Sequence, residues 1–161
     1  MKVIKEQVTV GKGDFYMSKK SEMALQCFSE GFSCSQAVFT AYCEDLGLDK
    51  ETGLKISGAF GGGMGHIGEV CGAVTGAFML IGLKHGNYKE GDSAAKEKTY
   101  MLVKEFANRF KKEHGSVRCK ELLKYDISIE EELLKAREAG VFKSACPMLV
   151  KRAVEIVKEV L

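Results

Sequence analysis

Apolar side chains recur at helical spacing along most of the chain, and the central part shows this most clearly. Leu102, Phe106 and Phe110 follow one another at four-residue intervals, which places them on one face of an α-helix. Asp92 precedes this stretch and Gly115 follows it, and these residue types are typical of a helix N-cap and a C-terminal stop. The pattern predicts one long amphipathic helix.

The same signals predict further helices on both sides of this one. A first helix covers residues 18–31, and a second is capped by Ser33 and closed by Gly47. The last helix opens at Pro147, because proline fits the first turn of a helix. Its inward face carries Leu149, Ala153, Ile156 and Val160. Shorter helices are predicted at residues 119–124 and 130–139.

Residues 70–83 form an almost entirely apolar segment, which is typical of a helix buried on all sides. Its small residues would let a neighbouring backbone approach closely. We therefore expect an all-α fold, a multi-helix bundle around this central apolar helix. A helix this apolar also fits an interface between copies, so a homodimer is a further expectation.

The first 17 residues differ from the rest of the chain. Val3, Val8 and Val10 alternate with polar residues, and Gly11 and Gly13 interrupt the pattern. We interpret residues 1–17 as a short N-terminal arm. Residues 18–161 then form a single all-α domain, which is what a chain of 161 residues favours.

Composition and charge exclude several classes of partner. The formal net charge of +2 is too nearly balanced for a protein that binds nucleic acid or an anionic membrane surface. The longest uncharged apolar run, residues 71–83, is shorter than the roughly 20 residues that cross a bilayer. Residues 1–7 carry charges where a signal peptide has its apolar stretch. We expect no nucleic acid partner, no membrane insertion and a cytoplasmic location.

The six cysteines are unexpected in that compartment, where thiols accumulate for metal binding or redox chemistry more readily than for structural disulfides. Cys27 and Cys43 fall within predicted helices, where a buried thiol behaves as a small hydrophobe. The other four fall at predicted helix N-termini, where the backbone N–H groups favour a thiolate. These four are Cys34, Cys71, Cys119 and Cys146. No CxxC pair occurs, so spacing alone leaves gap-filling cysteines as an equal alternative.

A glycine-rich stretch, GGGMGHIG at residues 61–68, lies just before Cys71. Residues 63–68 match the G-x-G-x-x-G dinucleotide fingerprint, but that fingerprint needs a βαβ unit and the chain continues with helices. We interpret the stretch as a tight connection that positions Cys71. His66 lies in this loop, where it could donate a hydrogen bond to a sulfur or serve as an ordinary loop histidine.

Three segments carry a resemblance to a known family: GFSCSQAV at residues 31–38, FGGGMG at residues 60–65 and CGAVTG at residues 71–76. With them, residues 18–161 resemble the redox-active family named for its C_GCAxxG_C_C pattern. The resemblance leaves out the two cysteines that the helical pattern assigns to the core. It implies four functional cysteines, which fall on Cys34, Cys71, Cys119 and Cys146.

A related domain occurs in split-Soret cytochromes, where an iron–sulfur centre accompanies c-type haem, and this similarity implies a cluster. Because the chain has no CxxCH motif, haem is not expected. Four thiolates suit a [4Fe–4S] or [2Fe–2S] cluster, whose negative charge gains from helix N-termini. The loop could bring further groups against the cluster as cofactor-binding residues, namely Gly62, Gly63, Gly65 and His66.

We therefore expect an iron–sulfur protein that transfers electrons or senses redox state, with an unidentified redox protein as its partner. A metal-free thiol–disulfide protein is the first alternative, because helix-end thiolates suit that chemistry equally well. A structural zinc protein with four cysteine ligands is the second, although such sites usually have two closely spaced cysteine pairs. A substrate-specific enzyme is less expected, because the chain offers no nucleophile–base pair beyond the cysteines.

Overall fold

The computed structural model describes residues 17–161, and every regular element in that part of the chain is a helix. The predicted arm, apart from its last residue, lies outside the described residues. The α-helices are α1 (Lys19–Ser29), α2 (Cys34–Thr40), α3 (Lys50–Ser57), α4 (Gly61–Met64), α5 (Gly72–His85), α6 (Ser93–His114), α7 (Cys119–Leu123), α8 (Glu130–Glu138), α9 (Val141–Ser144) and α10 (Cys146–Val160). Two short 3₁₀ helices, Glu44–Leu46 and Gly58–Phe60, complete the described part.

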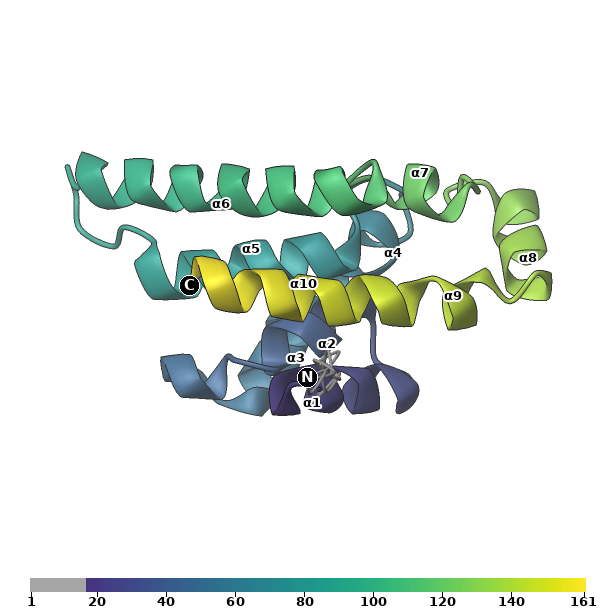
Figure 1. Cartoon of the computed structure of the whole chain (residues 1–161), viewed down its shortest axis with the longest axis horizontal. Helices are drawn as coiled ribbons and strands as arrows, with labels where there is room; N and C mark the ends of the chain where they lie inside the picture. The colour runs from purple at the N-terminus through teal and green to yellow at the C-terminus, as the bar shows by residue number, and fades with distance from the viewer. Residues whose placement is uncertain (1–16) are drawn as a thin grey trace, which may run out of the picture.

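The helices form layers around α5 (Figure 1). Helix α6 lies along one side, α5 and α10 occupy the middle, and α1 to α3 lie on the other side, while α7 and α8 are at one end. Helix α5 contacts α2, α6 and α10, and most of its residues are buried. The all-α bundle around a central apolar helix is thereby confirmed. Within residues 17–161 no helix combines the length and the apolar character that a membrane span requires.

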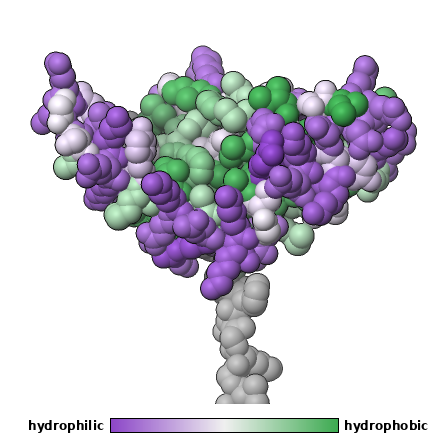
Figure 2. Space-filling view, turned by 90° about the horizontal axis from the view of Figure 1, so that it is seen from above, coloured by the Kyte–Doolittle hydropathy of each residue, from purple (hydrophilic) through white to green (hydrophobic). Residues whose placement is uncertain are grey.

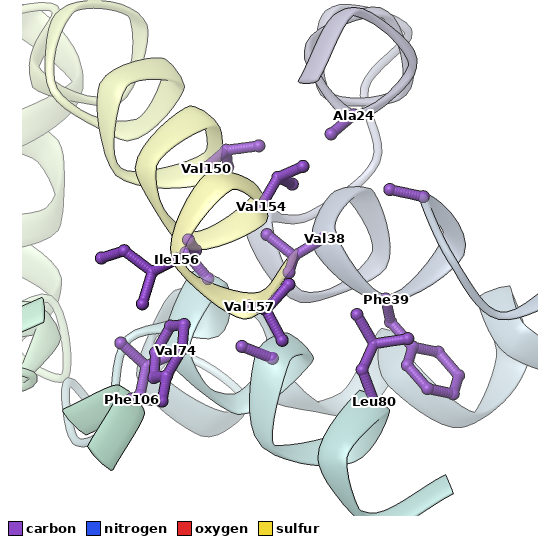
Figure 3. Close-up of a cluster of buried hydrophobic side chains, with 14 of the residues drawn as sticks. Ala24, Val38, Phe39, Val74, Leu80, Phe106, Val150, Val154, Ile156 and Val157 are labelled. Carbon is purple, nitrogen blue, oxygen red and sulfur yellow. The ribbon is translucent and has the colours of Figure 1, made fainter. Parts of the chain in front are cut away.

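The main core is built from aliphatic and aromatic side chains of the longer helices (Figure 3). Phe106 and Phe110 are fully buried on the inner face of α6, and Leu102 is nearly so, as their spacing predicts. Phe106 meets Phe78 of α5 edge to face, with 5.8 Å between ring centroids. The predicted inner face of α10 is also buried, and Val150, Val154 and Val157 widen it.

Two predicted caps, Ser33 and Asp92, are present, and Ser18 also caps the first helix. The Ser18 side chain accepts a hydrogen bond from the Ser21 N–H at 3.1 Å, and Asp92 accepts one from the Ala95 N–H at 3.0 Å. Ser33 forms a capping box with Gln36, whose side chain accepts a hydrogen bond from the Ser33 N–H at 2.9 Å. The residue that follows this cap is Cys34, so the box fixes where that cysteine begins its helix.

The structure differs from the sequence-based expectation between residues 40 and 47. Helix α2 ends at Thr40 instead of continuing to Gly47, because the chain tightens there into turns closed by i→i−3 hydrogen bonds. Cys43 therefore lies in a turn rather than inside a helix.

The structure also differs near the C-terminal helix. Helix α9 was not predicted, and α10 begins at Cys146, so Pro147 is its second residue.

Candidate functional site

The four cysteines at helix N-termini meet at one cavity. Cys34, Cys119 and Cys146 are the first residues of α2, α7 and α10, and Cys71 is the N-cap residue of α5. The cavity volume is about 20 Å³, which is room for about one water molecule. Its remaining lining is glycine or apolar: Gly62, Gly72, Leu122, Leu123, Phe142 and Leu149. Among the described residues, sulfur is thus the only side-chain metal ligand in this lining.

Two glycines of α5 bring Cys34 and Cys71 together. A Cβ atom at Gly72 would lie 3.1 Å from the Cβ atom of Cys34, and one at Gly76 would lie 2.8 Å from the Ser35 carbonyl oxygen. Larger residues would therefore push α2 away from α5. The glycines of the CGAVTG segment set the distance between the first two cysteines.

Cys71 and Cys119 are joined through their backbones. The Cys71 N–H donates to the Val117 carbonyl at 2.8 Å, and the Cys119 N–H donates to the Glu69 carbonyl at 2.6 Å. These bonds flank an isolated antiparallel bridge between Val70 and Arg118. The segments that precede α5 and α7 therefore run side by side, which sequence spacing does not reveal.

The glycine loop packs against this pair of segments. Gly62 and Gly63 have φ values of 62° and 68°, in the left-handed region that favours glycine. A Cβ atom at Gly63 would lie 2.7 Å from the Cβ atom of Cys119, so the loop backbone directly supports that cysteine. Gly62 lines the cavity, whereas Gly65 and His66 are exposed and absent from its lining. Residues 54–60 before the loop are helical, which agrees with the rejection of a dinucleotide site.

Burial has the largest effect on the pKa values of Cys71 and Cys119. It raises the pKa of Cys71 to about 11, although the N–H groups of Ala73 and Val74 lower it by hydrogen bonding. It also raises the pKa of Cys119 to about 12. A hydrogen bond from the Cys34 thiol lowers the pKa of Cys146 and raises that of Cys34 well above its usual range. The expectation of four helix-end thiolates is therefore wrong for three of them, because loss of solvent outweighs the helix N-terminus.

The other two cysteines lie in the main core. Cys27 is 5 % exposed, and its sulfur contacts the Thr40 hydroxyl at 3.8 Å. Cys43 is fully buried against Gly53. Neither lines the four-cysteine cavity. The structure thus brings four cysteines together and leaves two apart, in the division that the sequence predicts.

All six cysteines are free thiols. Among residues 17–161, no three His, Cys, Asp or Glu side chains are arranged so that all could bind one metal ion.

A family model described as "Putative redox-active protein (C_GCAxxG_C_C)" matches residues 32–160. The matched segment contains all four cysteines of the cavity and also Cys43, whereas Cys27 precedes it. No curated protein and no solved structure matches the chain.

Proposed function

The chain belongs to the C_GCAxxG_C_C family of redox-active proteins, and from this premise we propose that it holds one iron–sulfur cluster and carries electrons through it. The proposed ligands are Cys34, Cys71, Cys119 and Cys146.

The observation that carries the proposal is the convergence of cysteines that are distant in sequence. Four thiols from four helix starts line one cavity, and no other polar side chain of residues 17–161 lines it. Thiolates are the ligands that iron–sulfur clusters use, and four of them satisfy a [2Fe–2S] or a [4Fe–4S] cluster. A cluster bound there supplies one-electron transfer.

The protein environment suits an anionic group. Helix N-termini stabilise negative charge, and the N–H groups of Ala73 and Val74 already donate to the Cys71 sulfur. Such hydrogen bonds raise the reduction potential of a cluster, because they favour its more negative state. Because their pKa values are raised, Cys71 and Cys119 are neutral thiols when no iron is bound, so cluster assembly releases protons from them.

A cluster is larger than the cavity, so its binding requires the four side chains to spread apart. The elements that cover the cavity are suited to such a shift. Helices α7 and α9 have only 5 and 4 residues, and α9 has no side-chain cap. Leu123 of α7 and Phe142 of α9 form part of the cavity wall.

The lining of the cavity favours an electron carrier or redox sensor over an enzyme with a bound substrate. Sites for small molecules usually have a few polar groups that orient the substrate, and among residues 17–161 this lining has none besides the four thiols. The proposal therefore includes a separate redox partner that exchanges electrons with the cluster.

A metal-free dithiol protein is the second candidate, and one contact supports it. Interaction between the two thiols lowers the pKa of Cys146 and raises that of Cys34, so a disulfide between Cys34 and Cys146 is the pairing that this candidate predicts. Cys146, with the lowered pKa, would be the attacking thiol and Cys34 the resolving one. Burial of Cys146 weakens this candidate, because reactive cysteines are usually partly exposed.

Anaerobic purification of the full chain tests the proposal. We expect iron and acid-labile sulfide in equal amounts, a broad visible absorption band, and partial bleaching of this band on reduction with dithionite. Zinc without sulfide would identify a structural zinc site instead. Protein that contains no metal and forms a specific Cys34–Cys146 disulfide would establish the dithiol function.

A further inference from the structure

The outer face of α6 presents two large apolar side chains to solvent. Tyr100 is 56 % exposed and Met101 is 58 % exposed, and both line a depression formed only by residues of this helix. They lie on the side of α6 opposite the buried Phe106. On the face of the molecule seen from above, the α6 side of Figure 1, hydrophobic residues gather in the middle and hydrophilic residues lie on both sides (Figure 2).

The charges around this apolar pair are arranged symmetrically along the helix. Glu97 lies three residues before Tyr100, and Lys104 lies three residues after Met101. All four side chains line the same depression. Within residues 17–161 neither Glu97 nor Lys104 forms an ion pair, whereas Arg109 further along α6 pairs with Glu105 and Glu159.

This charge pattern is self-complementary. When a second copy of the helix runs in the opposite direction, each acidic position of one copy faces a basic position of the other. Two such helices can pair antiparallel about a twofold axis that passes between Tyr100 and Met101. Glu97 of each copy then lies opposite Lys104 of the other, so two ion pairs form. Tyr100 and Met101 then meet their own counterparts beside the axis, where their apolar surface leaves water.

We propose that the outer face of α6 is a homodimer interface, in which α6 pairs antiparallel with α6 of a second copy. The contact is isologous, because the same patch serves both partners and closes the assembly at two copies. A single helix face is a small interface, so dimerisation depends on protein concentration and weakens with salt. The interface involves none of the four cavity cysteines, so it does not depend on the proposed cluster.

Charge exchange tests the pairing directly. The variants are Glu97→Lys, Lys104→Glu and the double variant E97K/K104E, and association is measured by sedimentation equilibrium of the full chain at several concentrations. Each single reversal places two like-charged pairs across the axis and should weaken dimerisation by about tenfold or more. The double variant restores opposite charges and should dimerise within about threefold of the wild type.

A matched control is Glu51→Lys, which reverses an exposed charge on α3 and should leave dimerisation unchanged. A wild-type chain that stays monomeric at all concentrations would overturn the proposal. So would single reversals that leave the dimer intact, since the contact would then lie on another face. A double variant as weak as either single variant would also overturn it. Iron content, measured in parallel, should be equal in all variants.

Discussion

Two regions of the molecule bury their side chains in different ways. The helical core, formed by α1, α2, α5, α6 and α10, is filled mainly by aliphatic and aromatic side chains from long helices. The cysteine end, formed by α4 and α7 to α9 around the cavity, has a much smaller buried cluster. Two of its five buried members are cysteines, since the cluster consists of Cys119, Leu123, Ile127, Ala136 and Cys146.

This difference indicates which region is stabilised by the fold alone and which region a bound ligand would stabilise. Burial of carbon stabilises the core without any partner, because each fully buried large apolar side chain contributes about 1.5–3 kcal/mol. The cysteine end buries thiols that could bind iron and combines them with short helices. We therefore expect the core to be stable on its own and the cysteine end to depend on what the sulfurs bind.

The largest effect should come from the core. Phe106→Ala removes a fully buried ring that contacts Phe78 and Phe110, and should lower the free energy of unfolding by about 3–5 kcal/mol. Chemical denaturation followed by circular dichroism measures this loss. Tyr100→Ala, at an exposed position of the same helix, is the control and should change the monomer's stability by about 0.5 kcal/mol or less.

The packing of α2 on α5 within the core, which brings Cys34 and Cys71 together, can be disturbed at a single glycine. Gly76→Ala would place a Cβ atom 2.8 Å from the Ser35 carbonyl oxygen, and should destabilise the protein by about 1–3 kcal/mol and lower its iron content. Gly82→Ala is the matched control in the same helix, because a Cβ atom there meets nothing within 4 Å. That change should stabilise the fold by about 0.5–1 kcal/mol. Equal effects of the two substitutions would contradict the close packing of α2 on α5.

Removal of iron should affect the two regions unequally. Amides of α7, α8 and α9 should exchange hydrogen about tenfold faster after chelation, since the ligand no longer holds Cys119, which begins α7, and Cys146, which lies two residues after α9. Amides in the middle of α5 should keep their protection. Hydrogen exchange with mass spectrometry measures both regions in one experiment. An increase spread evenly over the chain would show that the core also depends on the ligand.

The smallest expected effect is a pH dependence of stability that arises from His114 at the C-terminal end of α6. Burial lowers the pKa of His114, and its buried Nε2 atom has no hydrogen-bond partner among residues 17–161. Because the unfolded chain then binds the proton more tightly, this histidine's contribution is complete above about pH 6.5 and decreases as the pH falls below that value. Denaturation between pH 8 and pH 5 should show this loss, and His114→Gln should reduce it. An unchanged pH profile in that variant would assign the loss to other groups.

The sequence predicts much of the helical core because its signals are local. The four-residue spacing of Leu102, Phe106 and Phe110 and the caps Asp92 and Gly115 suffice to locate α6. The positions of the four cavity cysteines at helix starts are predicted for the same reason. Local signals do not reveal the contacts made by Gly72 and Gly76, because these depend on how α2 and α5 pack.

The cysteine end was harder to predict because its features are long-range. The bridge between Val70 and Arg118 joins segments 48 residues apart, and no periodicity marks it. Helix α9 has only 4 residues, too few for an apolar pattern to show. The protonation of Cys71 and Cys119 was predicted incorrectly because the helix N-terminus can be read from sequence, whereas the extent of burial cannot.

The most direct test of the account compares all six cysteines in one series. Each is changed singly to alanine, and iron and acid-labile sulfide are measured per chain after anaerobic purification. We expect the cluster to be lost or converted in Cys34→Ala, Cys71→Ala, Cys119→Ala and Cys146→Ala. Cys27→Ala and Cys43→Ala should keep it and lose only packing, about 1–2 kcal/mol of stability. Full iron and sulfide in any of the first four variants, or loss of the cluster in a folded variant of the last two, would contradict the proposed ligand set.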